Sequence, residues 1–532
     1  MTAPDPAAAS PAPKKRGGLL RSSAVFSAMT LISRIAGFAR DMLQATLFGT
    51  GGAMSAFIVA YRIPNFLRRV FAEGSMAMAF VPVLNEIKER GDRAALKSFI
   101  DHMAGALCAV VLVVCALGML LAPMIARLFA PGWVDQPELL GQTAQMLRIT
   151  FPYLFFISLM SLSASILNSH GRFALPAFTP VLHNLTMIAA MLWLAPRFAL
   201  PPEGLAWGVL IAGFLQLALL WPALGRLGLR PRFRPGFRHP EVRKVGRLML
   251  PTLFSSSVAQ VNLLVGTAFA SLLAAGSVDW LYYSDRLIEF PLGLFGVALG
   301  TVILPHLSRR HAAEDATGYN QSLDWGLRMA LLAGVPAGLG LLLLAEPITA
   351  TVYNYGAFGA EDTRMAAISL TAMSLGVPAF MLSKVLAPAF YARQDTKTPM
   401  RAAIWTVAAN VLLTIALTTP LWLYEIPGAH GGIALATALA GVVNAALLWR
   451  YLRQRGIFTP EPGWVTYALR LACACAAMAV VVLGLRFWIG AWTDIQGALH
   501  RVGWLVLVIG AGGATYVIAM VALGLRPRHL RH

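Results

Sequence analysis

Residues 107–126 read LCAVVLVVCALGMLLAPMIA, an apolar block without a single charged side chain. A helix needs about 20 such residues to cross the hydrocarbon core of a membrane. Comparable blocks occupy residues 205–224, 402–423 and 502–525. Of the 532 residues in the chain, 58% are hydrophobic and 13% are charged, whereas a soluble domain carries about 25% charged residues. The composition therefore predicts an all-α, polytopic membrane protein.

Working outward from this block, the hydrophobic pattern predicts about fourteen membrane-spanning helices. We place them at residues 24–48, 54–85, 98–128, 138–168, 176–196, 203–225, 248–274, 278–307, 322–345, 362–391, 400–421, 431–450, 464–487 and 502–525. Every second loop is rich in lysine and arginine, and the loops between are nearly bare. Because cytoplasmic loops carry such an excess, we expect a multi-pass protein of the cytoplasmic (inner) membrane with both termini in the cytoplasm.

The formal net charge of +19 follows from the same loops and does not call for a nucleic-acid partner. The 4 cysteines all fall within apolar stretches, and none forms the C-x-x-C spacing of a metal site. We therefore expect no bound metal.

Two parts of the chain resemble each other at a constant spacing. Gly52-Ala-Met-Ser55, followed by Arg62, returns as Gly276-Ser-Val-Asp279, followed by Arg286. An offset of about 223–225 residues predicts two parallel halves of six spans, an arrangement typical of alternating-access transporters. The predicted division is a disordered basic cytoplasmic tail at 1–22, an N-lobe at 23–226, a basic linker with an interfacial segment at 227–247, a C-lobe at 248–455, two further helices at 456–525 and a basic cytoplasmic tail at 526–532.

Charged residues inside the predicted spans are the main functional signal. An arginine at the centre of a membrane helix costs roughly 2.5–3.5 kcal/mol, so such residues must face water, a partner charge or a ligand. The set comprises Arg34, Arg40 and Asp41 in the first span, Arg62, Arg68, Arg69 and Glu73 in the second, Asp285, Arg286 and Glu289 in the eighth, and Lys384 in the tenth.

Helical spacing allows part of this set to form ion pairs that merely hold helices together. Arg40 and Asp41 are adjacent, Arg69 and Glu73 are four residues apart, and Arg286 and Glu289 are three apart. The six arginines still outnumber the four carboxylates by two, before Lys384 is counted. A cavity with net positive charge favours an anionic ligand, and guanidinium groups suit phosphate.

Several catalytic classes lack their sequence signatures. The chain contains no H-E-x-x-H, no G-x-x-x-x-G-K-[ST] and no G-x-S-x-G. Without an ATP site or another cofactor, any transport is expected to draw on an ion gradient or on the membrane potential. A membrane-embedded transferase acting on polyprenyl substrates stays an alternative, although Asp41 and Asp285, its only candidate catalytic groups, have arginine neighbours.

The charged spans contain long motifs that resemble the MurJ (MviN) lipid II flippase family. They are SRIAGFARD at 33–41, IPNFLRRVFAEG at 63–74, YYSDRLIEFP at 282–291, KVLAPAFYARQD at 384–395 and FTPEPGW at 458–464. The resemblance extends over nearly the whole chain. It implies the fold of the multidrug/oligosaccharidyl-lipid/polysaccharide (MOP) exporter superfamily, with two six-helix lobes in a V and two C-terminal helices.

The resemblance also implies a function and a site. Such a flippase is not an enzyme: it moves lipid II, an undecaprenyl-pyrophosphate-linked precursor, from the cytoplasmic to the periplasmic leaflet. An exporter of another polyprenyl-pyrophosphate-linked oligosaccharide is the nearest alternative. Membrane lipids and other cell-wall synthesis proteins are further candidate partners. The family's headgroup-binding residues would fall on Arg34, Arg40, Arg68 and Arg286 with Asp41, and the expected substrate site also includes Arg62, Arg69, Asp285 and Glu289.

Two further expectations follow from the resemblance. The lipid tail would use a groove formed with the last two spans. Some members carry an acidic residue where Ser55 stands, whereas this chain has its acid at the equivalent position of the second repeat, Asp279.

Overall fold

The structure, a computed structural model, describes residues 16–69, 76–495 and 497–525. Most of the predicted N-terminal tail, the whole predicted C-terminal tail at 526–532 and Glu73 lie outside the described residues. Within them, all regular secondary structure is helical.

The described residues of the first half of the chain form nine α-helices. These are α1 (Arg16–Phe48), α2 (Gly52–Arg68), α3 (Met76–Glu89), α4 (Arg93–Leu120), α5 (Ala122–Phe129), α6 (Pro137–Thr150), α7 (Tyr153–Ser169), α8 (Ala174–Ala189) and α9 (Pro201–Arg226). Short turns follow α5 at Pro131–Trp133 and extend α8 through Ala190–Leu194 and Ala195–Arg197.

The second half follows the same pattern and adds two helices. It contains α10 (Pro240–Ser271), α11 (Ser277–Pro291), a π-helical turn η5 (Leu292–Gly296), α12 (Val297–Ala312), α13 (Ala316–Leu343), α14 (Ala345–Tyr353), α15 (Ala360–Ser374), α16 (Val377–Tyr391), α17 (Lys397–Leu423), α18 (His430–Gln454), α19 (Trp464–Ile489), the turn Trp492–Asp494 and α20 (Ala498–Ala522).

Several predicted spans are two helices rather than one. The predicted span 138–168 divides into α6 and α7 beside Pro152, whose ring cannot continue the hydrogen-bond ladder. The predicted span 362–391 divides into α15 and α16, which are bent by 45°. In the described part of the chain, nine helices, or ten with this bent pair, are long and apolar enough to cross a membrane by length and composition. The stretch Pro137–Ser169 counts as one of the nine, whereas the charged helices α1, α2 and α11 are not among them, so the total of fourteen stays a prediction.

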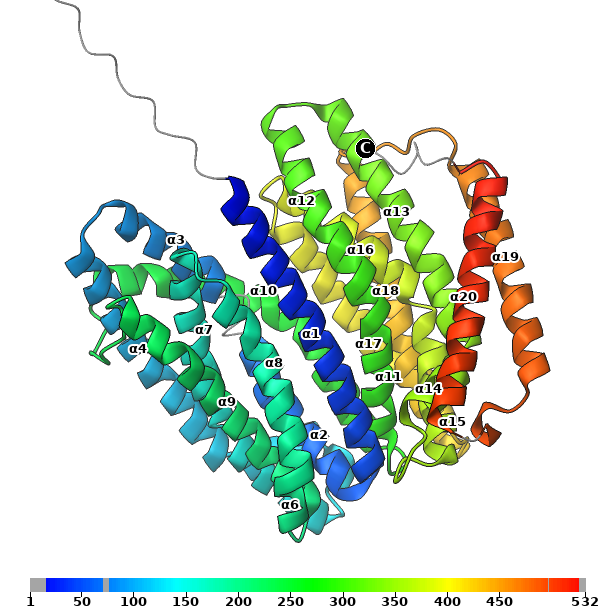
Figure 1. The fold of residues 1–532 in the computed structure, drawn as a ribbon, viewed down its shortest axis with the longest axis horizontal. Coiled ribbons are helices and arrows are strands. Elements are labelled where there is room, and N and C mark those ends of the chain that lie inside the picture. Colours follow the sequence, from blue (N-terminus) through cyan, green and yellow to red (C-terminus); the bar gives the residue numbers. More distant parts are fainter. Residues whose placement is uncertain (1–15, 70–75, 496, 526–532) are drawn as a thin grey trace, which may run out of the picture.

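The helices form two bundles that lean apart as a V (Figure 1). In one, α1 packs on α8, α2 on α6, and α7 on α9; in the other, α13 packs on α16, α11 on α15, and α17 on α18. Helix α10, which we assigned to the C-lobe, packs on α17 but also on α3 of the first bundle. The start of α1 and the end of α20 lie at the same end of the molecule (Figure 1). The boundaries of the two lobes stay predictions.

The two bundles meet at one end, which we call the closed end and define by residues 46–55, 276–279 and 356–362. The amide of Ala357 donates to the carbonyl of Thr46 over 2.9 Å. The Thr50 hydroxyl donates to Asp362, which also accepts from the indole of Trp280 at 2.9 Å. Gly356 has φ of +58°, and a Cβ there would lie 2.4 Å from the Thr46 carbonyl oxygen. Only glycine permits so close an approach in this conformation.

The last two helices pack on the second bundle through α13 and α14. Asp324 of α13 is buried and accepts hydrogen bonds from the amide of Glu461 at 3.1 Å and the indole of Trp464 at 2.7 Å. Arg328 donates to Asp324 at 2.7 Å and lies over the Trp464 ring. This polar clamp fixes the start of α19 to α13. The predicted lipid-tail groove beside α19 and α20 stays a prediction.

Candidate functional site

Helices α1 and α8 position the first basic group. Arg40 donates to one carboxylate oxygen of Asp41 through Nε at 3.0 Å and Nη2 at 2.7 Å, which confirms the pair expected from their adjacency. Its remaining nitrogen, Nη1, donates to Oδ1 of Asn184 at 3.1 Å. The Asn184 amide in turn donates to the carbonyl of Ser33 at 2.9 Å. Both sides of the guanidinium are therefore held, and its direction is set by a residue of another helix.

The sequence reasoning did not assign Asn184 to the site. The only feature of the local sequence that could have indicated this role is a polar amide side chain inside a predicted span. Asn184-Leu-Thr186 also matches a glycosylation sequon, which says nothing about the site. A Cβ at Gly37 would lie 3.3 Å from the amide nitrogen of Asn184, so the glycine leaves room for this crossing of α1 and α8. The neighbouring His183 is also buried and interacts electrostatically with Arg40 and Arg68.

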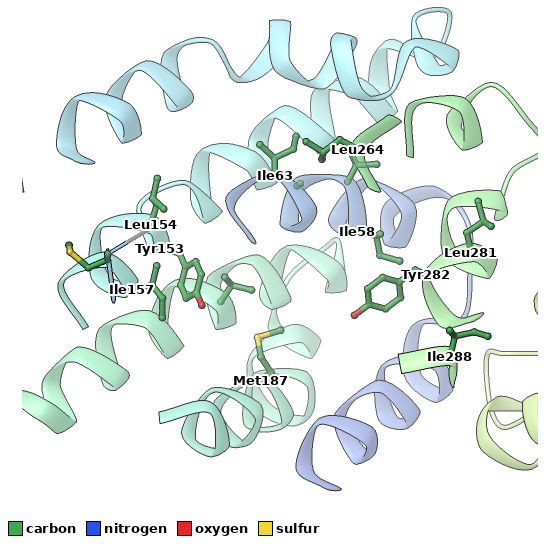
Figure 2. Close-up of a cluster of buried hydrophobic side chains, with 14 of the residues drawn as sticks. Ile58, Ile63, Tyr153, Leu154, Ile157, Met187, Leu264, Leu281, Tyr282 and Ile288 are labelled. Carbon is green, nitrogen blue, oxygen red and sulfur yellow. The ribbon is translucent and has the colours of Figure 1, made fainter. Parts of the chain in front are cut away.

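Helices α2 and α11 carry the second basic group. Arg62 is 5% exposed, donates to the Thr267 hydroxyl of α10 at 2.5 Å and lies 3.6 Å from a carboxylate oxygen of Asp285. Its guanidinium also lies over the Tyr282 ring, 5.8 Å from the centroid. Figure 2 shows Tyr282 beside Ile58 of α2, within the apolar packing between these two helices. The guanidinium of Arg62 is therefore engaged by the Thr267 hydroxyl and the Asp285 carboxylate of the protein itself.

Arg286 also lies over the Tyr282 ring and is less enclosed than Arg62. It donates to Glu289 at 2.8 Å, which confirms the pair expected from their spacing, and lies 5.1 Å from the centroid of the Tyr282 ring. Its side chain is 25% exposed, and that of Glu289 is 52% exposed.

The remaining predicted residues lie around these two groups. A Cβ at Gly293 would lie 1.9 Å from Nη1 of Arg34, so this arginine of α1 rests on the π-helical turn after α11. Arg68 donates to Asn65 at 2.9 Å. Arg69 lies 4.0 Å from Glu289, and its expected pairing with Glu73 stays a prediction, because Glu73 lies outside the described residues. Lys384 of α16 is exposed and packs against Gly296 of the same turn.

The structure therefore brings predicted residues from α1, α2 and α11 toward one interior region between the bundles. Of the predicted carboxylates, Asp41, Asp285 and Glu289 are described, and six arginines accompany them. With Glu73, which lies outside the described residues, the same spans carry four carboxylates, so the excess is six minus four, or two positive charges. An interior with this balance suits an anionic group that several guanidinium groups can share. By contrast, a hollow of about 620 Å³ on α17, lined by residues such as Ile415, Pro420 and Leu423, has no charged lining residue.

The helical architecture and this charged interior define a multi-pass membrane protein of the transporter type. The fold agrees with solved structures. A structure described as "Inward-facing conformation of a multidrug resistance MATE family transporter of the MOP superfamily" matches 82% of this chain and 98% of its own, with a TM-score of 0.62 at 13% identity. At that identity the match concerns the fold alone.

The family follows from closer matches. The family model "Lipid II flippase MurJ" matches residues 44–498. A Burkholderia cenocepacia protein named "Lipid II flippase MurJ" is 38% identical over 96% of this chain and 99% of its own. A Vibrio cholerae protein named "Probable lipid II flippase MurJ" is 41% identical over 96% of this chain and 98% of its own. The structure "Lipid II flippase MurJ, inward closed conformation" matches 94% of this chain and 98% of its own, with a TM-score of 0.77 at 28% identity. The chain belongs to the lipid II flippase MurJ family.

Proposed function

We propose that this protein moves lipid II from the cytoplasmic to the periplasmic leaflet of the inner membrane by alternating access, and that the interior arginines bind its pyrophosphate. Family membership supports the substrate class. The observation that supports the binding mode is that Arg62 and Arg286 both lie over the Tyr282 ring, in spans that carry six arginines and four carboxylates.

The arginines differ in how free they are to meet a ligand. Arg62 is enclosed by Thr267 and Asp285 and serves best as a fixed positive charge. Arg286 is partly exposed, and its buried Nε has no hydrogen-bond partner among the described residues. A buried donor without a partner is costly unless a ligand or water supplies an acceptor. We therefore propose Arg286 as the principal contact to the pyrophosphate.

Exposing the site on the side of the closed end requires the contacts there to separate while the opposite end closes. The contacts there include hydrogen bonds between loops and helix ends of the two bundles. Such contacts can exchange for water when the bundles tilt, which favours rocking of two rigid bundles about the site. An ion gradient or the membrane potential is the proposed driving force.

The test replaces Arg286 in cells where this chain is the only lipid II flippase. Arg286→Ala should lower the rate at which lipid II becomes accessible to an added lipid II hydrolase by roughly 10-fold or more, because a hydrogen bond to a charged group is worth about 1.5–3 kcal/mol. Arg364→Ala is the matched control, since that arginine is 64% exposed and pairs with Glu361 on the surface. Wild-type flipping by Arg286→Ala would contradict the proposed binding mode.

The substrate is tested separately by depletion. Removing the protein should make lipid II accumulate on the cytoplasmic side while its synthesis continues. If a different polyprenyl-linked glycan accumulates there instead, lipid II is not the substrate.

A further inference from the structure

Asp279 is completely buried in the first turn of α11, yet it makes no ion pair among the described residues. Its Oδ2 atom accepts hydrogen bonds from the amide of Gly51 at 3.0 Å and from the hydroxyl of Ser55. Both donors belong to the other bundle, at the start of α2. The second oxygen, Oδ1, has no hydrogen-bond partner in the described structure.

Ser55 and Asp279 are also equivalent positions of the internal repeat. They are 224 residues apart, the same offset that relates Arg62 to Arg286. Equivalent residues of two related halves can contact each other only near the axis that relates the halves. The hydrogen bond between Ser55 and Asp279 therefore marks this pseudo-two-fold axis at the closed end.

This contact has a geometric consequence for the site. Arg62 follows Ser55 by seven residues on α2, and Arg286 follows Asp279 by seven residues on α11. Seven helical residues correspond to about two turns, or roughly 10.5 Å along each helix. The two helices are thus joined at the axis, and each carries one site arginine at the same height above the joint.

We propose that Ser55 and Asp279 are positioning residues: one carboxylate on the axis joins α2 to α11, keeps the closed end together and sets the spacing of Arg62 and Arg286. Because the two positions are equivalent, a carboxylate at position 55 on α2 should join the helices as well as the carboxylate of Asp279 on α11 does. The activity readout of this proposal rests on the proposed lipid II flipping, whereas its distance readout does not.

A purely local role for Asp279 makes a different prediction. An acid in the first turn stabilises the N-terminus of its own helix by interacting with the helix dipole. In that case the carboxylate would be needed on α11 itself, and moving it to α2 would restore nothing. The exchange of the two residues therefore separates the two explanations.

The experiment compares Asp279→Ser, Ser55→Asp and the exchanged double variant Ser55→Asp/Asp279→Ser. The distance across the closed end is measured by electron paramagnetic resonance between spin labels at Asp135→Cys and Glu361→Cys, after replacement of the native cysteines. Both label positions are exposed. Lipid II flipping is measured in parallel, and the amount of protein in the membrane is the control for folding.

Asp279→Ser should lengthen the label distances and lower flipping about tenfold or more, since the carboxylate that joins the helices is gone. Ser55→Asp should do the same, because two carboxylates then face each other. The double variant should return both readouts most of the way to wild type. If Asp279→Ser is poorly inserted, Asp279→Asn, which keeps one acceptor for Ser55, should give an intermediate distance shift.

The proposal is overturned if the double variant is as displaced and inactive as Asp279→Ser, or if Asp279→Ser leaves the label distances unchanged. If wild-type protein does not flip lipid II but the distances follow the expected pattern, the proposed function fails and the positioning contact stands.

Discussion

Asn184 provides a test of whether the direction of a site arginine, and not merely its charge, matters for binding. In Asn184→Ala, Arg40 keeps both hydrogen bonds to Asp41 and therefore stays in place as a charge. It loses the bond from Nη1 to Asn184, whose length is 3.1 Å. The guanidinium can then rotate away from the direction that the crossing of α1 and α8 imposes.

The expected magnitude follows from that single bond. A hydrogen bond from a charged donor is worth about 1.5–3 kcal/mol. If this energy is what orients Arg40 for the ligand, the dissociation constant for lipid II rises roughly 10-fold to 100-fold, at 1.4 kcal/mol for each factor of ten. The fold itself should change little, because the Ser33 carbonyl that loses its contact to Asn184 lies within helix α1.

The assay is a binding titration of purified protein in nanodiscs with a short-tailed lipid II analogue. Thr186→Ala is the matched control, because its hydroxyl bonds to Leu182 within α8 itself. In a double-mutant cycle, Arg40→Ala/Asn184→Ala should bind no more weakly than Arg40→Ala alone. Unchanged affinity in Asn184→Ala, or additive losses in the double variant, would refute the positioning role.

Three further predictions concern stability. Gly105→Ala should lower the thermal unfolding temperature, because its Cβ would lie 1.8 Å from the backbone oxygen of Arg234 and such overpacking costs about 1–3 kcal/mol. Gly141→Ala is the control, because a Cβ there meets no atom within 4 Å. Asp324→Ala should destabilise the start of α19 by about 3–5 kcal/mol, seen as faster proteolysis of residues 456–463, and unchanged cleavage would contradict the clamp. The amide of Gly318 lowers the pKa of Asp315, with Arg310 as a further cause. This helix cap therefore stabilises α13 fully above the unfolded pKa of about 3.9, and its contribution is lost as the pH falls through the lower folded value. Amide hydrogen exchange in the first turn of α13 should become faster over that pH range, and Asp315→Asn should remove this pH dependence.

The sequence alone determined the membrane class and the family. Apolar blocks such as 107–126 are a property of consecutive residues, so they identify helices without any knowledge of their neighbours. The ion pair Arg286–Glu289 was predictable for the same reason, because side chains three residues apart on one helix are neighbours.

The tertiary structure decided the contacts between distant residues. Asn184 reaches Arg40 across 144 positions, and Ser55 reaches Asp279 across 224. Arg69, which directly follows α2, lies 4.0 Å from Glu289 of α11. Such partners depend on the rotation and crossing of packed helices, which the charge pattern of a single helix does not contain. A membrane helix reveals by its own sequence that it carries an arginine, whereas the packing of its neighbours decides what that arginine meets.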